Sequence, residues 1–419
     1  MPAYLVAATL TRLASEMLPL TVVLLVLDRG GGESAAGWTV AAYTLPAVVS
    51  GPLLGAWLDR TRHTRAALAA NQVLLAVAAL GLLASAGRAP AAAVSLAVLA
   101  GVASPMTSGG FSSLVPRIAR GRESAVVTAW DAATFNAAAI AGPALAGTLS
   151  ATVNAGSAMA VTAVCALAGL AGTALLAFDR PHDPADRTAE RAARPSSDGS
   201  GRPRQSPPPP LLASVVAGTR HLLRTPPLLG ATATTVLGFG STGLLTLALP
   251  LHLRNLGAEA GAAGWVWAAL EVGCAASTLV LARWIGARRP ENVVFASTAG
   301  YGLALVLWPL APTPALLVVA GVVTGLVEGP TLPAVISARR AHTPPEMLAQ
   351  VHTTGASLKV GAYALGAAIG ARLVPELGSS ATLGIVAGCQ VVAALVGWSL
   401  ARTRSGKTRT STDNTDRNA

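Results

Sequence analysis

The polar segment DRPHDPADRTAERAARPSSDGSGRPRQSPPPP, residues 179–210, divides this 419-residue chain into two apolar halves. Its Pro, Ser and Arg content leaves too little apolar surface for a core, so it is expected to be a disordered linker. Outward from it on each side lie six apolar stretches. A helix that spans the bilayer needs about 20 such residues. The predicted spans are 4–27, 38–58, 66–86, 91–111, 125–149, 155–178, 228–251, 262–285, 291–311, 314–337, 347–371 and 378–400.

The composition indicates a membrane protein. Hydrophobic residues make up 52% of the chain and charged residues 12%, whereas soluble domains carry about 25% charged residues. The alternation over about ten residues that marks membrane β-strands is absent. The fold class predicted is therefore an all-α membrane protein with twelve transmembrane helices in two parallel six-helix repeats.

The chain is expected to have four parts. Residues 1–178 and 228–400 form the two six-helix bundles, 179–227 a cytoplasmic linker, and 401–419 a disordered basic tail. Within the linker, LLASVVAGTRHLLRTPP (211–227) interleaves apolar and basic residues, which favours either an amphipathic helix on the inner leaflet or an extension of the seventh span.

Weak internal similarity relates the halves. GWTVAAY at Gly37 resembles GWVWAAL at Gly264, and AGVASPMTSGG at Ala100 resembles AGVVTGLVEGP at Ala320. Both pairs are roughly 220 residues apart. Two parallel repeats with a site between them near the membrane midplane are a known plan for transporters.

The basic residues fall on one side of the predicted membrane. Cytoplasmic loops of transmembrane proteins carry an excess of Lys and Arg, which predicts that both termini and the linker are cytoplasmic. The loops on that side hold Arg60, Arg62, Arg65, Arg117, Arg120, Arg122, Arg283, Arg288, Arg289, Arg339 and Arg340. The opposite loops hold Arg29, Arg88, Arg254 and Arg372. The formal net charge of +11 is thus explained without a nucleic-acid partner.

Three local patterns resemble the major facilitator superfamily. GPLLGAWLDRTRHTR (51–65), between the second and third spans, is similar to the family's signature loop through Gly55, Asp59, Arg60 and Arg65, although Arg62 stands where a second Gly is usual. The resemblance implies a gate on the cytoplasmic side, whereas ordinary positive-inside loop chemistry is the alternative.

The second motif, AIAGPALAG (139–147), is similar to an element of the fifth helix in exporters of the superfamily. Gly142, Pro143 and Gly147 match it. Proline can kink the helix, and the glycines permit close helix packing. GTRHLLRTPPLLG (218–230) also looks like a segment of the bacterial drug and siderophore exporter group.

Six charged residues lie inside the predicted spans and away from the span ends, where charge is costly and usually marks function. They are Arg12, Glu16, Asp131, Glu271, Glu328 and Lys359. The third, sixth, ninth and twelfth spans have none, and the resemblance implies that these four face lipid. Each carboxylate either binds a proton or a cationic substrate, or is permanently paired.

Two pairings among these charges are possible. Arg12 and Glu16, four residues apart, can share a helix face. Glu328 and Lys359 lie at comparable depth and could form an ion pair. Arg12 and Lys359 are expected to orient the acids or to meet an anionic group of a substrate. Trp130, Phe135 and Phe239 are candidates either for contact with an apolar substrate or for simple packing.

The function predicted is export of a small amphipathic molecule, by alternating access and against inward proton flow, by a monomer in the cell membrane. The direction rests on the resemblance. The fourth span lacks the embedded Arg of many drug/proton antiporters, which weakens direct transfer of their mechanism. The alternatives are an importer or uniporter of a metabolite, and a membrane receptor without transport. GFGSTG at Gly238 has the GxGxxG spelling of a dinucleotide-binding loop, but it lies inside an apolar span without the strand and crossover helix that this loop needs. No Walker A sequence, HExxH sequence or Cys/His cluster with metal-ligand spacing occurs, so no enzymatic activity, cofactor or metal is expected.

Overall fold

The computed structural model describes residues 2–60, 63–112, 114, 122–175, 211–286 and 288–403. All regular structure in these ranges is helical. The helices are α1 (Pro2–Asp28), α2 (Gly32–Thr44), α3 (Ala47–Arg60), α4 (Thr64–Ser85), α5 (Pro90–Pro105), η1 (Met106–Gly110), α7 (Arg122–Thr152), α8 (Ala155–Ala174), α10 (Leu211–Arg224), α11 (Pro226–Asn255), η2 (Ala260–Ala262), α12 (Ala263–Gly286), α13 (Pro290–Leu305), α14 (Leu307–Leu310), α15 (Pro314–Glu328), α16 (Thr331–His342), α17 (Pro345–Leu377) and α18 (Ser379–Thr403).

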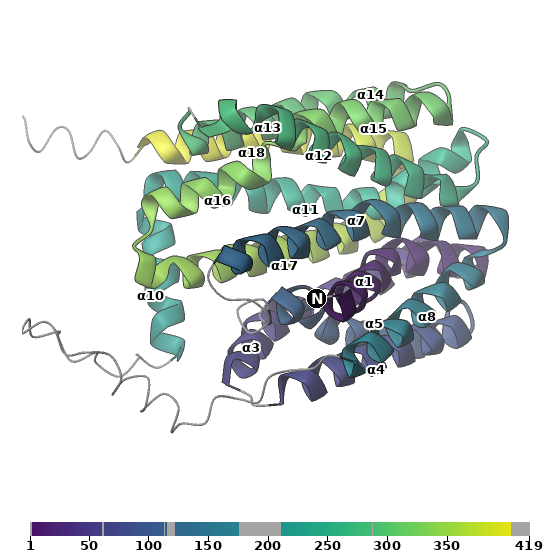
Figure 1. Cartoon of the computed structure of the whole chain (residues 1–419). Coiled ribbons are helices and arrows are strands. Elements are labelled where there is room, and N and C mark those ends of the chain that lie inside the picture. The colour runs from purple at the N-terminus through teal and green to yellow at the C-terminus, as the bar shows by residue number, and fades with distance from the viewer. Residues whose placement is uncertain are drawn as a thin grey trace, which may run out of the picture.

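The two halves pack by the same scheme. In the first half α1 packs on α7 and α8, and α4 packs on α8; in the second half α11 packs on α17 and α18, and α13 packs on α18. The halves lie side by side with their long helices running in the same general direction (Figure 1). They meet where α2 packs on α17 and where α7 packs on α12. The predicted pair of six-helix repeats is therefore confirmed.

Ten helical segments in the described part of the chain are long and apolar enough to cross a membrane. The other two predicted spans, 38–58 and 91–111, are interrupted helices. The first is split into α2 and α3 at Leu45–Pro46, because Pro46 has no N–H to donate. The second ends its α-helical part at Pro105 and continues as the π-helix η1. The corresponding span of the second half breaks at Gly329–Pro330, between α15 and α16.

Glutamine side chains link helices inside each half. Gln72 Nε2 on α4 donates to Thr11 Oγ1 on α1, 2.8 Å away, and to Thr173 Oγ1 on α8, 2.9 Å away. In the second half Gln390 Nε2 on α18 donates to the backbone oxygen of Gly238 on α11 at 2.9 Å. Such buried hydrogen bonds fix the helix register where apolar packing alone has little directionality.

The helix α10 is separate from α11, because Thr225 between them is extended. It lies across one end of the molecule (Figure 1), where His221 Nε2 is 2.9 Å from the backbone oxygen of His342. We call this the α10 end. A short independent helix was one of the two alternatives for this segment, and continuation of the seventh span is wrong. The rest of the predicted linker, 179–210, and most of the predicted tail lie outside the described residues.

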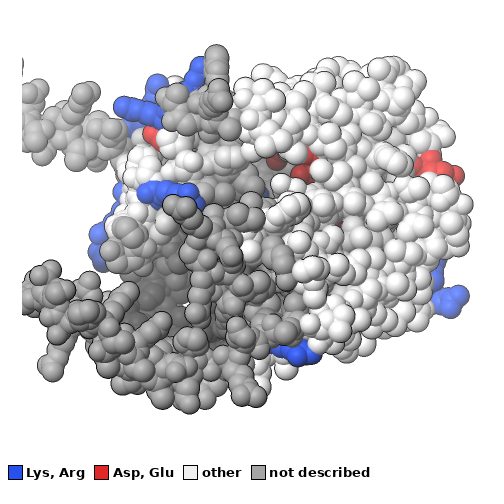
Figure 2. All heavy atoms as spheres, viewed as in Figure 1, with Lys and Arg blue, Asp and Glu red and all other residues white. Residues whose placement is uncertain are grey.

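Exposed basic residues gather at the α10 end. Figure 2 shows most of the Lys and Arg there, with a few at the opposite end and an almost uncharged band between them. This distribution fits a protein whose middle band lies in hydrocarbon and whose ends lie in water. The exposed arginines at the α10 end include Arg65, Arg220, Arg224, Arg288, Arg289, Arg340 and Arg402.

Candidate functional site

A cavity of about 690 Å³ lies between the two halves. Side chains of α1, α2, α3, α5 and α7 line it from the first half, and side chains of α11, α12, α13, α15 and α17 from the second. The four charged residues in its wall are Arg12, Glu16, Glu271 and Glu328. Four of the six in-span charges predicted from the sequence therefore reach one cavity.

The family resemblance implied that the third, sixth, ninth and twelfth spans face lipid. The described residues of α4, α8 and α18 agree with this expectation, because none of them lines the cavity. The ninth span differs, because Tyr301 of α13 lines the cavity.

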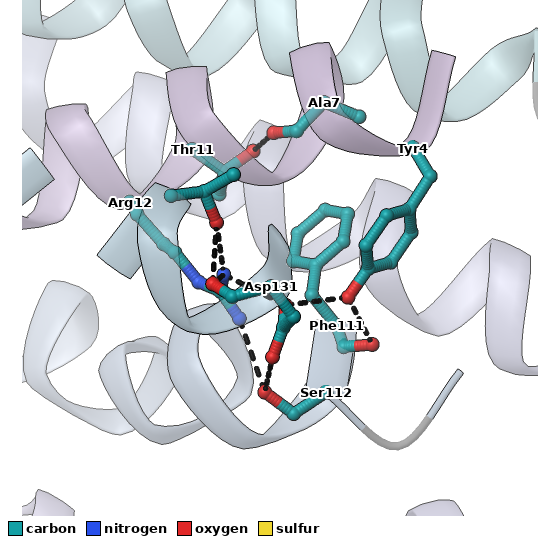
Figure 3. A network of polar contacts seen from close by, with 8 residues as sticks. Tyr4, Ala7, Thr11, Arg12, Phe111, Ser112 and Asp131 are labelled. Atoms are coloured by element: carbon teal, nitrogen blue, oxygen red, sulfur yellow. Dashed lines mark hydrogen bonds and ion pairs between the residues drawn. The ribbon is translucent and has the colours of Figure 1, made fainter. Parts of the chain in front are cut away.

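Arg12 and Asp131 form a buried ion pair at the wall of the cavity (Figure 3). Arg12 Nη1 is 2.8 Å from Asp131 Oδ1. The same nitrogen donates to the backbone oxygen of Asp131 at 2.9 Å and to Thr134 Oγ1 at 2.5 Å. Arg12 is only 1% exposed. Arg12 thus pairs with an acid of α7 and not with Glu16, the acid one turn away on its own helix.

Hydroxyl groups complete the coordination of Asp131. Tyr4 Oη donates to Asp131 Oδ1 at 2.6 Å, and Ser112 Oγ donates to Asp131 Oδ2 at 2.7 Å. These contacts join α1, α7 and the chain that follows η1 (Figure 3). A buried charge with this many partners has the arrangement of a permanent structural contact. Asp131 therefore fits the paired alternative among the roles predicted for the carboxylates.

Glu16, Glu271 and Glu328 have a different environment. Each is half-buried, and Glu271 lies near enough to both of the others to interact with them electrostatically. Neither Glu16 nor Glu271 makes a hydrogen bond or ion pair with any residue that the structure describes. One of these two acids comes from each half, on α1 and on α12.

Glu328 lies beside Lys359 without touching it. No carboxylate oxygen among the described residues comes within 4.0 Å of Lys359 Nζ, so the expected ion pair is not formed, although the two charges interact through space. Both residues line a second cavity of about 50 Å³ inside the second half. Lys359 Nζ lies 3.9 Å from the centre of the Phe239 ring, and Cys274 Sγ lies 3.9 Å from Glu328 Oε2.

The glycines of the predicted motif on α7 lie at close helix contacts. A Cβ at Gly142 would come within 2.7 Å of Glu16 Cβ, so the small residue sets how closely α1 and α7 approach beside this acid. A Cβ at Gly147 would meet the backbone oxygen of Gly261. Pro143 lines the cavity from the same turn.

The predicted gate motif is only partly described. Gly55, Asp59 and Arg60 belong to α3, but their side chains lie outside what the structure describes, as does Arg62. Arg65 at the start of α4 donates to the backbone oxygen of Ala174 at the end of α8. Its role as a gate residue stays a prediction.

Aromatic side chains of the cavity were only partly predicted. Phe135 and Phe239 line it, whereas Trp130, the third aromatic candidate, is exposed and does not. The wall also includes Tyr43, Trp267, Tyr301 and Tyr363. Their spacing offered a signal: Trp267 precedes Glu271 by four residues and Tyr363 follows Lys359 by four, which places each pair on one helix face. Tyr4, Ser112 and Thr134 could not be found this way, because their partner is on another helix.

Comparison with known proteins agrees with this architecture. The family model described as Major Facilitator Superfamily matches residues 4–252 and 231–418. An uncharacterized MFS-type transporter, y4rN of Sinorhizobium fredii, is 27% identical over 402 residues, which cover 94% of this chain and 92% of that protein. The enterobactin exporter EntS of Escherichia coli is 31% identical over 191 residues, 42% of this chain and 44% of EntS.

Solved structures share the fold. A crystal structure of the nucleoside transporter NupG superposes with a TM-score of 0.74 at 14% identity, covering 95% of this chain and 98% of that one. A crystal structure of a peptide transporter, POT, in complex with sulfate gives a TM-score of 0.69 at 16% identity, covering 95% and 94%.

Two six-helix repeats around a central polar cavity define a multi-pass membrane transporter. With the family model matched along almost its whole length, the chain belongs to the major facilitator superfamily.

Proposed function

We propose that this protein is a proton-coupled exporter of a small amphipathic molecule and works by alternating access. The observation that carries the proposal is the central cavity, whose wall combines carboxylates of both halves with aromatic and apolar side chains. Ionisable groups at membrane depth commonly mark substrate and proton pathways. A protein group that binds either a proton or a substrate can couple the two flows.

The packing at the two ends supports the direction of access. At the end opposite α10, the backbones of α7 and α12 touch, since a Cβ at Gly264 would lie 2.0 Å from the backbone oxygen of Pro143. Toward the α10 end the cavity wall continues to Thr107 and Thr353. The positive-inside rule places the α10 end in the cytoplasm. The cavity then faces the compartment from which an exporter loads its substrate.

Two rigid halves are the moving parts in this proposal. Residues 1–178 and 228–400 rock about the α2–α17 and α7–α12 contacts, while the Arg12–Asp131 pair holds the first half together. We expect the protein to act as a monomer in the plasma membrane, with both termini in the cytoplasm. The resemblance of less than half of the chain to EntS supports export as the direction.

Reconstitution in liposomes with an entrapped pH dye tests this proposal. Lipophilic cations, macrolide-like compounds and neutral metabolites are added in turn. Substrate-dependent proton movement is expected for the wild type and is lost in Glu16→Gln or Glu328→Gln. Glu376→Gln, an exposed acid on α17 outside the cavity wall, is the matched control. Substrate flux without proton movement would contradict the coupling and indicate a uniporter, and binding without flux would contradict transport.

A further inference from the structure

We infer that the cavity binds hydrophobic organic cations, and that Glu16 of the first half and Glu271 of the second hold the positive charge. This inference specifies the substrate class of the proposed exporter, and it rests on the proposed function only in taking the cavity as the substrate path. Anionic and neutral amphipathic molecules would also fit the cavity volume, so the charge of the substrate is the property that the inference adds.

The balance of charge in the cavity wall is the first argument. The positive charge of Arg12 is matched by Asp131, 2.8 Å away. Lys359 interacts more strongly with Glu328 than with Glu271. Neither Lys359 nor Arg339, a further cation near it, lines the cavity, so the described part of the wall carries one cation, Arg12, and three carboxylates. When all groups are ionised, the wall therefore has two negative charges in excess.

The lack of protein partners for the two remaining acids is the second argument. Glu16 and Glu271 are half-buried, yet no described residue donates a hydrogen bond to either of them. They repel each other across the boundary between the halves. A carboxylate held away from bulk water is costly unless it is protonated or paired. A cation placed between them would remove both costs at once, and would join the halves through a single ligand.

Aromatic rings around the acids are the third argument. The chain has only 4 tyrosines, and Tyr43, Tyr301 and Tyr363 all line this cavity. The faces of aromatic rings attract organic cations. Two rings of the wall already contact cations of the protein, since Arg12 lies 4.8 Å from the centre of the Phe135 ring and Lys359, behind the wall, lies 3.9 Å from that of Phe239.

The cavity has the size for a rigid organic ion. Small-molecule sites occupy about 300–1,000 Å³, and the cavity measures about 690 Å³. Trp267 precedes Glu271 by one helical turn and lines the same wall, so a ring face and a carboxylate are presented together. A compact cation with aryl groups, such as tetraphenylphosphonium, matches both features.

The test compares two ions of nearly the same shape and opposite charge. The full-length protein in nanodiscs of zwitterionic lipid is titrated with tetraphenylphosphonium and with tetraphenylborate, and binding to empty nanodiscs is subtracted. We expect saturable binding of the cation and none of the anion. Equal binding of the two ions by the wild type would overturn the inference, and this comparison needs no variant.

Variants then locate the charge. Glu16→Gln and Glu271→Gln should each weaken binding of tetraphenylphosphonium by about tenfold or more, because each removes one of the two unpaired carboxylates. Glu376→Gln should leave the affinity unchanged. Wild-type affinity in both cavity variants, with each shown to be folded by its thermal unfolding, would overturn the assignment.

The outcomes separate the inference from the proposed function. Selective cation binding without flux in liposomes would leave the cation site in place and contradict the exporter. Proton-coupled flux of neutral or anionic compounds, with no preference for the cation, would leave the exporter in place and contradict the cation site.

Discussion

At the scale of single residues, the six in-span charges divide into two groups with different environments. Arg12 and Asp131 are buried and fully engaged with each other, with Tyr4 and with Ser112. Glu16, Glu271 and Glu328 line a cavity and lack such coordination. We therefore expect the first group to stabilise the bundle and the second to bind ligands.

Replacing Asp131 by Asn should destabilise the protein, because it leaves the Arg12 charge buried without a counter-charge. Breaking a buried pair in this way costs about 3–5 kcal/mol. Thermal unfolding of the detergent-solubilised protein measures the loss, and Asp28→Asn, at an exposed site on α1, is the control. The double variant Arg12→Met with Asp131→Leu should recover much of the loss. A wild-type unfolding temperature for Asp131→Asn would show that the pair is not a stabilising contact.

The sequence predicted which residues are charged inside the membrane, but not how they pair. Glu16 lies one turn from Arg12, which favoured contact along the helix. Asp131 is 119 residues from Arg12 in the chain. A rule based on spacing within one helix therefore cannot predict their contact. The long arginine side chain reaches across to α7 instead.

At the scale of helices, close glycine contacts hold the end of the molecule opposite α10. Gly147 and Gly264 bring α7 and α12 together, and Gly37 packs against Ala371 where α2 meets α17. Gly37 and Gly264 occupy the same place in the repeated sequences GWTVAAY and GWVWAAL. The weak internal similarity therefore marks equivalent contacts between the halves.

Gly264→Ala should open this end. The added Cβ would lie 2.0 Å from the backbone oxygen of Pro143, where no side-chain rotation can relieve the contact. Spin labels are placed at Thr152 on α7 and at Glu259 before α12, in a background without native cysteines. The distance between them, measured by double electron–electron resonance, should increase. Gly384→Ala on α18 is the control, because a Cβ there would meet no atom within 4 Å. Unchanged distances in Gly264→Ala would contradict the role of this contact.

Helix interruptions mark where the sequence prediction of elements was incomplete. The apolar pattern of residues 38–58 and 314–337 is continuous, so both read as single spans. The prolines at 46 and 330 break them, because proline lacks the N–H that the helix needs. The mean hydropathy of each span stays high despite its proline, so a count of apolar residues does not reveal either break.

At the scale of the whole molecule, the sequence specified the fold more fully than the site. Span length, the central polar segment and the one-sided arginines all constrain the architecture independently. The cavity depends instead on how two bundles of about equal size dock, which leaves no local trace in the sequence beyond scattered ionisable and aromatic residues.

The exposed arginines at the α10 end predict that this end of the molecule is cytoplasmic. In a bacterial host, green fluorescent protein fused after Ala419 should fluoresce, and alkaline phosphatase fused there should be inactive. Alkaline phosphatase fused after Gly257, in the loop at the opposite end, should be active. The reverse pattern would place the α10 end outside the cell and remove the argument for loading from the cytoplasm.

Labelling of Ser357 tests the central claim most directly, namely that the cavity between the halves is a substrate path entered from the α10 end. Ser357 lines the cavity from α17, and it is replaced by Cys in a background without native cysteines. A membrane-impermeant maleimide should label it in inside-out vesicles but not in right-side-out ones, and tetraphenylphosphonium should slow the labelling. Labelling from the opposite side alone, or labelling indifferent to every substrate that the protein transports, would contradict the account.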